Sequence, residues 1–162
     1  TADIIFRLIK RRLFVFREKT IMNVFIIGSP LETAKALDKL RLNKQIIECQ
    51  QILDALEGKK AWSHHPCTLQ YKGHERWLMN YMSCLLRYKH GEYGRAEVSS
   101  QWCEQDKPSF HTEEFFNQMK RRLYTKNPEH YAQFAEYGPS DENWYWSPSE
   151  QKIIKYVNGK RV

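Results

Sequence analysis

Residues 37–53, "LDKLRLNKQIIECQQIL", form the most regular pattern in the sequence. At about 100° of rotation per residue in a helix, apolar side chains gather on one side, and we expect that side to face a core. These side chains are Leu42, Ile46, Cys49, Leu53 and Leu56. A polar stripe follows another side of the same helix and consists of Arg41, Lys44, Gln45, Glu48 and Gln51. Ile47 and Ile52 flank this stripe, so we expect it to be partly covered rather than fully solvated.

Two interpretations of the polar stripe are open at this point. The ordinary one is a solvated helix face on which Lys44 and Glu48 form an ion pair worth a few tenths of a kcal/mol. The functional one is a carboxylate held beside cations that bind phosphate, as in an enzyme that works on nucleic acid. The stripe alone does not choose between them.

Local signals around this stretch predict where helices begin and end. Ser29, Pro30 and Glu32 form a capping box with proline in the first turn. A helix should therefore run from about residue 30 to 57, bend near residue 40 and end at Gly58. Further helices are predicted at about 73–89, 95–103 and 112–125, with a restart after Asn127.

The remaining segments predict little sheet. Residues 23–27, "NVFII", should form one short edge strand or an extended lead-in. Connecting loops are expected near 59–67 and, rich in aromatic residues, at 138–150. An Asn-Gly pair at 158–159 can close a terminal hairpin. The fold class is therefore mostly α: a single compact helical domain with a short N-terminal strand and a C-terminal hairpin.

Composition narrows the class of protein. The chain has 162 residues and 41% apolar content, which suit one domain with one core. It has no run of about 18 apolar residues, so no membrane segment is expected. The four cysteines include no CxxC pair, which favours reduced thiols in a cytoplasmic protein. A zinc site from Cys67 with His64 or His65 lacks the second half of the usual ligand pattern, so no metal is expected.

The net charge of +7 is unevenly distributed and suits a polyanionic partner. Residues 1–21 hold six Lys or Arg against two Asp or Glu. We expect this segment to be an appended extension before a natural start at Met22. The alternatives are a basic arm that touches nucleic acid and an amphipathic membrane-surface segment. Residues 22–162 would then form the single helical domain.

Three segments together resemble a known family. They are residues 37–53, already quoted, residues 62–81, "WSHHPCTLQYKGHERWLMNY", and residues 121–134, "RRLYTKNPEHYAQF", followed by "WYWSP" at 144–148. In this order they are similar to the pyrimidine-dimer DNA glycosylase family, and most of all to its bacterial branch. The likeness extends over roughly residues 22–148, and the first segment combined with "PEHY" is its most specific part.

The resemblance implies a reaction without metal or cofactor on double-stranded DNA. An amine would attack C1′ of the damaged nucleotide, the base would leave, and a Schiff base would form before β-elimination cuts the strand. Glu48 falls on the family's catalytic carboxylate. The amine would be the α-amino group of Met22. The alternatives are the amine of Thr1, a lysine such as Lys44, or the absence of lyase activity. We expect the enzyme to be a monomer.

The cations and amides expected to contact DNA come from the three segments and their neighbours. They are Arg41, Lys44, Gln45, His64, His65, Lys72, Lys120, Arg121 and Lys126. Each also has an ordinary interpretation: the histidine pair can cap a loop, and the cations of 119–126 can be a solvated helix face. Trp144, Tyr145 and Trp146 are expected in a core or corner, with base stacking as the alternative.

Some residues depart from the family pattern. Ile46 stands where many relatives carry an Arg, so one expected phosphate contact is absent. Met119 and Lys120 replace a His and an Arg, and Tyr71 stands where the bacterial branch has a Trp. Because of these departures, the sequence does not identify the lesion that is recognised, and two other functions remain as alternatives. One is a non-catalytic nucleic-acid-binding protein on the same fold, and the other is a nuclease or hydrolase that acts on another modified nucleotide.

Overall fold

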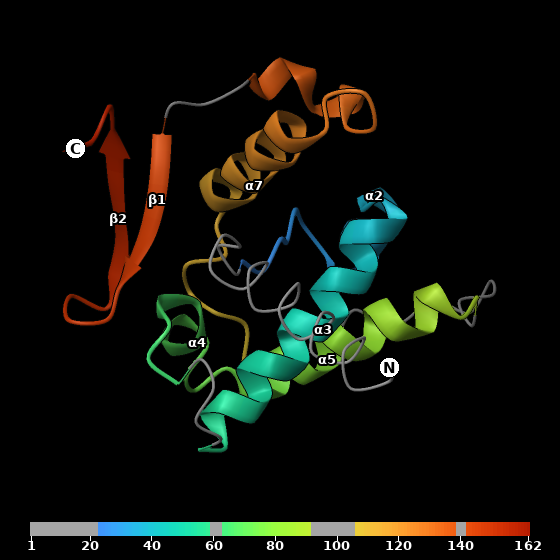
Figure 1. Ribbon diagram of the computed structural model, residues 1–162, viewed down its shortest axis with the longest axis horizontal. Helices are drawn as coiled ribbons and strands as arrows, with labels where there is room; N and C mark the ends of the chain where they lie inside the picture. The colour runs from blue at the N-terminus through green and yellow to red at the C-terminus, as the bar shows by residue number, and fades with distance from the viewer. Residues whose placement is uncertain (1–22, 59–62, 92–105, 139–141) are drawn as a thin grey trace, which may run out of the picture.

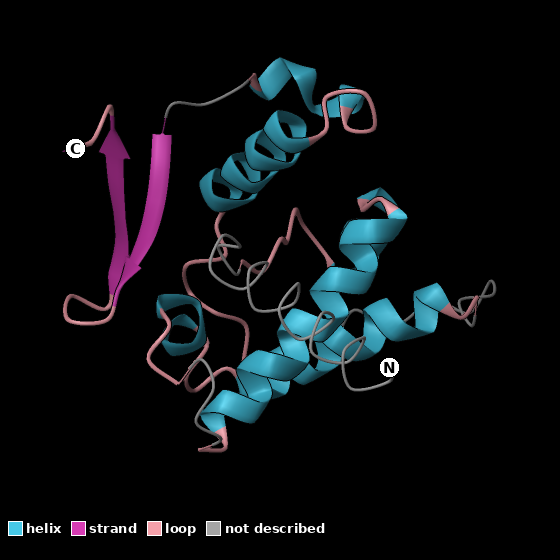
Figure 2. Cartoon of the chain, viewed as in Figure 1, coloured by secondary structure: helices cyan, strands magenta, loops and turns pink. Residues whose placement is uncertain are grey.

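The computed structural model describes residues 23–58, 63–91, 106–138 and 142–162. The helices in these ranges are α2 (Pro30–Ala36), α3 (Lys39–Leu56), α4 (Pro66–Gln70), α5 (Glu75–Lys89), α7 (Glu113–Lys126) and the 3-10 helix η1 (Ala132–Tyr137). The strands are β1 (Glu142–Ser147), β2 (Lys152–Val157) and β3 (Lys160–Arg161). The mostly α class is confirmed, with a small antiparallel sheet of order β1-β2-β3 near the C-terminus (Figure 2).

The helices form a body to which the sheet is added at one side. Helices α3 and α5 pack on each other, α2 also packs on α5, and α7 lies across the domain with η1 beside it (Figure 1). The short helix α4 lies between α3 and β1 and so connects the body to the sheet. The core between them is rich in rings, and Tyr71, Tyr81 and Tyr131 are fully buried in it. Cys49, Cys67 and Cys84 are buried free thiols, as expected for reduced cysteines.

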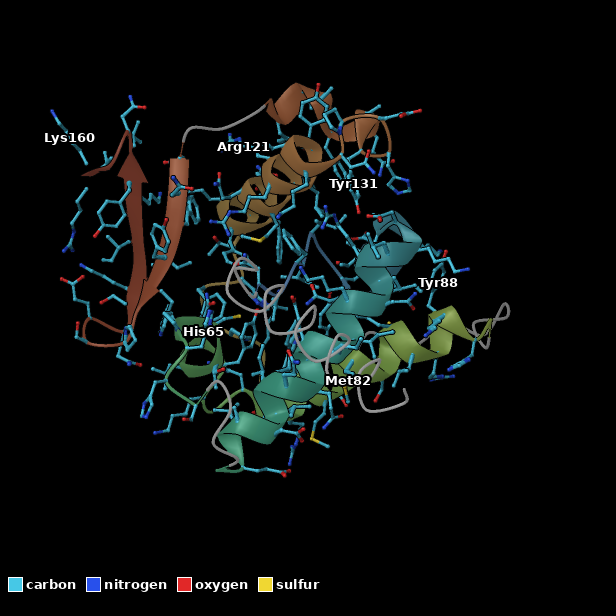
Figure 3. All side chains as sticks on the ribbon, in the orientation of Figure 1. His65, Met82, Tyr88, Arg121, Tyr131 and Lys160 are labelled. Carbon is cyan, nitrogen blue, oxygen red and sulfur yellow. The ribbon has the colours of Figure 1, made fainter. Side chains whose placement is uncertain are left out.

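The predicted helix from 30 to 57 is two helices separated at Leu37 and Asp38. Ser29 starts the first with the expected capping box, and the Asp38 side chain accepts a hydrogen bond from Arg41 N to start the second. The Tyr131 hydroxyl holds this break, because it accepts from Asp38 N at 3.0 Å and donates to the Asp38 carboxylate. Tyr131 reaches Asp38 from the region that leads into η1 (Figure 3). The bend near residue 40 therefore depends on a contact 93 residues away.

The strand predicted at 23–27 does not form, and the segment is an extended lead-in. Its backbone groups bond side chains in place of a neighbouring strand. Phe25 N donates to Gln45 Oε1 at 2.6 Å, and the Tyr81 hydroxyl donates to Phe25 O at 2.6 Å. Ile27 N donates to Thr33 Oγ1 at 3.1 Å. The apolar side chains Val24, Phe25 and Ile26 are buried, which explains why the stretch has a strand-like composition.

Three other local expectations need correction. The aromatic loop expected at 138–150 contains strand β1, because residues 142–147 pair with β2 from Glu142↔Val157 to Ser147↔Lys152. The loop at 59–67 leads into α4, which the sequence reading did not include. After Asn127 the chain makes a turn and then η1 rather than a new α-helix. Asn127 still caps this turn, since its Oδ1 accepts from His130 N at 3.2 Å.

The ends of α3 and α5 and the turn between β2 and β3 lie where the glycine and Asn-Gly signals in the sequence predicted them. Gly58 and Gly91 follow their helices with φ of 93° and 68°. Asn158 and Gly159 both have positive φ, as the tight turn between β2 and β3 requires, so the C-terminal hairpin is confirmed. The helix predicted near 95–103 and the extension 1–21 lie outside the described residues.

Gln45→Ala should destabilise the domain by about 2–4 kcal/mol, because Phe25 N and Asn23 O would both lose a buried partner. Urea unfolding followed by circular dichroism measures the change. Gln50→Ala on the same helix is the matched control, since Gln50 is exposed and bonds Asp54 one turn away, so its loss should cost less than about 0.5 kcal/mol. Equal effects of the two substitutions would contradict the anchoring role of Gln45.

Candidate active site

Glu48 lies in the middle of α3 and faces the lead-in segment rather than open water. Its side chain is 10% exposed, whereas an ordinary solvated glutamate would be mostly exposed. The backbone of Asn23 donates a hydrogen bond to its carboxylate, and Lys44 Nζ lies 3.7 Å from Oε1. The ordinary interpretation of the stripe as a solvated face is therefore wrong for Glu48, although the Lys44–Glu48 pair that it predicted is present.

Burial dominates the electrostatics of this carboxyl group. Removal from water raises the pKa of Glu48 to about 7. The charge of Lys44, the Asn23 backbone hydrogen bond and the charge of Lys126 oppose this rise and are too weak to cancel it. At neutral pH the group is therefore divided between its acid and its base form. A carboxyl group in this state can both give and take a proton, which general acid–base chemistry requires.

Asn23 is held at three points beside Glu48. Its backbone bonds the Glu48 carboxylate, its carbonyl oxygen accepts from Gln45 Nε2 at 3.0 Å, and its Oδ1 accepts from Arg122 Nη1 at 3.1 Å. Helices α3 and α7 thus fix the first described residue of the chain. The position of the residue before it, Met22, lies outside the described residues.

Two of the predicted cations, Lys44 and Lys126, act on the Glu48 carboxyl group, and a third, Arg41, acts on Lys126. Lys44 is the ion-pair partner, and Arg41, one turn earlier, also pairs with Asp38 at 3.5 Å. Lys126 comes from the end of α7. Its pKa is lowered, first by burial and then by the charges of Arg41, Lys44 and Arg122, while Glu48 opposes the shift. These mutual effects define an electropositive cluster of Lys126 with Arg41, Lys44 and Arg122, and the carboxyl group of Glu48 lies beside Lys44 and Lys126.

The other predicted site residues lie in different surroundings. Gln45 is buried and both of its amide atoms bond the lead-in backbone. Lys120 lies over the Tyr137 ring at 4.9 Å, and Arg121 Nε donates to Tyr137 O at 3.0 Å, so both contact η1. Figure 3 shows Arg121 on α7, on the side of the helix near η1.

The histidine pair marks the start of α4. His65 is its N-cap, and its Nδ1 accepts from Cys67 N at 3.1 Å, which agrees with the loop-capping interpretation. Burial lowers the pKa of His65, so the ring is neutral at pH 7. His64 and Lys72 are exposed on either side of this short helix.

Arg122 is a site residue that the sequence reading missed. It follows Arg121 in a run of basic residues that is typical of a solvated helix face. However, it stands three residues after the buried Met119 and seven residues after the buried Phe115. That helical spacing was the available signal, because it places Arg122 on the inner face of α7. Its Nη2 also donates to Trp144 O at 3.2 Å and so connects α7 to β1.

The described residues contain neither a cluster of metal ligands nor a helix that could span a membrane. Across residues 23–58, 63–91, 106–138 and 142–162, no three His, Cys, Asp or Glu side chains come together as metal ligands. In the same ranges, none of the helices has the length and apolar character needed to cross a bilayer.

Comparison with known proteins agrees with this geometry. Residues 22–88 match the sequence model of a family described as pyrimidine dimer DNA glycosylase. The predicted resemblance is therefore confirmed over the segment that carries Glu48 and its neighbours. The "PEHY" segment at 128–131 lies outside the matched range. No curated protein and no solved structure matches the chain.

Glu48→Gln should stabilise the fold at pH 8 by about 1–3 kcal/mol, because a carboxyl group with a raised pKa is ionised there at a cost that an amide does not have. The folded state holds this proton more tightly than the unfolded state. The gain should therefore shrink as pH falls through 7 and vanish below about 4.5. Thermal unfolding at several pH values measures it, with the exposed Glu136→Gln as control. A gain that is independent of pH would contradict the buried, raised-pKa carboxyl group.

Proposed function

We propose that the chain is a DNA glycosylase with an associated lyase activity, in which Glu48 transfers the protons and a chain-terminal amine is the nucleophile. The observation that carries the proposal is the Glu48 carboxyl group, buried, with a pKa of about 7, and bonded to the backbone of Asn23. In a chain that begins at Met22, the terminal amine is one peptide unit from Asn23. The family match over residues 22–88 supports the substrate class.

The steps follow from this arrangement. The neutral amine attacks C1′ of the damaged nucleotide, the glycosidic electron pair leaves with the base, and the amine loses a proton. The C1′–O4′ bond then breaks and O4′ takes a proton, so the sugar ring opens and C1′ becomes doubly bonded to the amine nitrogen in a protonated Schiff base. An α-amine has an unperturbed pKa near 8, so a useful fraction of it is neutral at pH 7. Glu48 as the acid protonates the departing base, and as the carboxylate it stabilises the positive charge on the sugar. Removal of a C2′ proton then expels the 3′ phosphate.

The cations provide the phosphate contacts in this proposal. Lys44 and Lys126 act on the carboxyl group and Arg41 acts on Lys126, so a sugar–phosphate chain at Glu48 would lie beside all three. The exposed His64 and Lys72 lie at α4 and would contact the backbone further along. Lys120 and Arg121 are partly exposed and would contact phosphates at the η1 side of α7.

A protein that starts at Met22, incubated with a duplex containing an abasic site and borohydride, should form a covalent adduct, because the reductant fixes the Schiff base. Peptide mapping should find the adduct on the N-terminal peptide. A form that carries residues 1–21 has no amine at residue 22 and should react much more slowly. An adduct on Lys44 or Lys126 would overturn the choice of amine, and tight binding without any adduct would favour the non-catalytic DNA-binding protein.

Glu48→Gln should lower the rate of base release from a duplex with a pyrimidine dimer by at least about 100-fold, since general acid–base catalysis contributes roughly that much or more. Binding of the same duplex should change little, because Lys44 and Arg41 remain. Gel-based cleavage and fluorescence anisotropy measure the two effects. Glu136→Gln serves as the control on the exposed surface of η1. Turnover that persists in Glu48→Gln would rule out the assigned role.

A further inference from the structure

The "PEHY" segment at 128–131 lies outside the family match, yet it contacts the matched half of the chain at two points. The hydroxyl of Tyr131 accepts from Asp38 N at 3.0 Å and donates to the Asp38 carboxylate. His130 Nε2 donates to Ala36 O, the last residue of α2, at 3.2 Å. Figure 3 shows Tyr131 between this turn and α2. The turn after α7 is therefore fixed to the break between α2 and α3.

Asp38, which Tyr131 holds in this way, is also the ion-pair partner of Arg41. Arg41 Nε is buried and lies 3.5 Å from Asp38 Oδ1, while the Arg41 side chain as a whole is 19% exposed. The pair uses Nε, whereas the terminal nitrogens of a guanidinium carry the N–H groups that match two oxygens of a phosphate. The Tyr131 hydroxyl therefore orients Asp38, and Asp38 orients the guanidinium of Arg41.

The same turn carries a second cation at its other end. Lys126 is the last residue of α7, and Asn127 is the C-cap that follows it. The backbone oxygen of Asn127 accepts from Tyr131 N at 3.0 Å, and its Oδ1 accepts from His130 N at 3.2 Å. Lys126 and Tyr131 thus belong to one hydrogen-bonded turn. The bonds from Tyr131 to Asp38 bring the end of α7 to the side of α3 that carries Arg41.

Arg41 and Lys126 repel each other in this arrangement. Burial is the largest cause of the lowered pKa of Lys126, and the charge of Arg41 is the next. Two like charges move apart when the elements that carry them are free to do so. The bonds of Tyr131 and His130 oppose that movement. A phosphate between the two cations would relieve the repulsion, and it would bind without the cost of bringing them together.

We propose that Tyr131 is a positioning residue for DNA binding: through Asp38 it fixes the guanidinium of Arg41, so that Arg41 and Lys126 hold one backbone phosphate between them. Tyr131 is fully buried and does not touch the phosphate itself. The inference rests on the proposed function for DNA as the ligand. It deepens that function, because it names the pair of cations that receives a phosphate beside Glu48 and the distant side chain that holds the pair.

The test measures binding of a duplex with a tetrahydrofuran abasic analogue, which has no hydroxyl at C1′ and so forms no Schiff base. Tyr131→Phe should raise Kd about ten-fold, because Arg41 loses its orientation although every charge remains. Arg41→Gln should raise Kd at least as much and lower the slope of log Kd against log salt by about 1. Tyr131→Phe added to Arg41→Gln should change Kd less than about two-fold, since no guanidinium is left to orient. Independent, additive effects of the two substitutions would overturn the proposal.

Tyr71→Phe is the matched control for the loss of a buried hydroxyl. Tyr71 and Tyr131 are both fully buried, and the Tyr71 hydroxyl bonds His111 Nε2 at 2.9 Å rather than a residue next to the cations. Both substitutions should lower the urea midpoint of unfolding, and only Tyr131→Phe should raise Kd. A Kd that rises equally in both would mean that Tyr131 has only a general structural role.

Asp38→Asn gives a test that does not depend on Tyr131→Phe being well folded. Asparagine also caps helices and can still accept from the Tyr131 hydroxyl, but it is not an ion-pair partner for Arg41. The substitution removes a negative charge near the DNA, so charge alone predicts a lower Kd. We expect a higher Kd, because Arg41 loses the carboxylate that orients it. A lower Kd would overturn the proposal.

These outcomes are separate from those that test the glycosylase. Wild-type protein that binds the analogue but does not cleave a true abasic site would reject the glycosylase, and the Kd comparisons would still decide the role of Tyr131. In an active protein, Tyr131→Phe should raise KM for that cleavage about ten-fold and change kcat less than about two-fold, because the contacts of Glu48 do not include Tyr131. Wild-type protein that does not bind the duplex would overturn both proposals.

Discussion

The arrangement of this domain depends on how the buried lead-in segment satisfies its backbone hydrogen bonds. Residues 23–27 run extended through the protein without a neighbouring strand, and each unpaired buried amide or carbonyl would be costly. Gln45 from α3, Tyr81 from α5 and Thr33 from α2 supply the partners. Three helices are thus fixed around one extended segment. The same hydrogen bonds place Asn23 against Glu48, so the element that organises the fold also completes the candidate site.

The buried carboxyl group of Glu48 and the cations near it reduce the stability of the fold, but they suit the proposed function. Burial raises the pKa of the carboxyl group to about 7, and the cations of the cluster lower it without restoring its ordinary value. The cations also repel one another, which contributes to the lowered pKa of Lys126. Four cations, Arg41, Lys44, Arg122 and Lys126, stand against two carboxyl groups, those of Glu48 and Asp38, so positive charge remains in excess. That excess suits a phosphate-bearing substrate.

The two halves of the sequence have different parts in the proposed site. The family match ends at residue 88, and it contains Glu48, Arg41 and Lys44. Arg122 on α7 and Trp144 on β1 follow this range, and the hydrogen bond between them brings the sheet to the helical body. The matched half therefore holds the carboxyl group and Lys44, while the later half supplies Arg122, which fixes Asn23 beside that carboxyl group.

Local sequence signals determined what depends on neighbours along the chain. The apolar period of 37–56 placed α3, the Ser29 capping box placed the start of α2, and Asn158–Gly159 placed the last turn, because each of these acts within one or two turns of backbone. The resemblance carried by the motif residues, not the stripe itself, selected Glu48 over a solvated face.

Tertiary structure decided what depends on partners far along the chain. The break at Asp38 needs Tyr131, 93 residues later, and β1 needs the register of β2, so neither is visible in its own segment. Glutamine usually lies at the surface, yet Gln45 is buried, because its amide group bonds the lead-in backbone at Phe25 N and Asn23 O. The pKa of Glu48 was decided in the same way, since a side chain's exposure to water depends on every element packed around it and not on the residue itself.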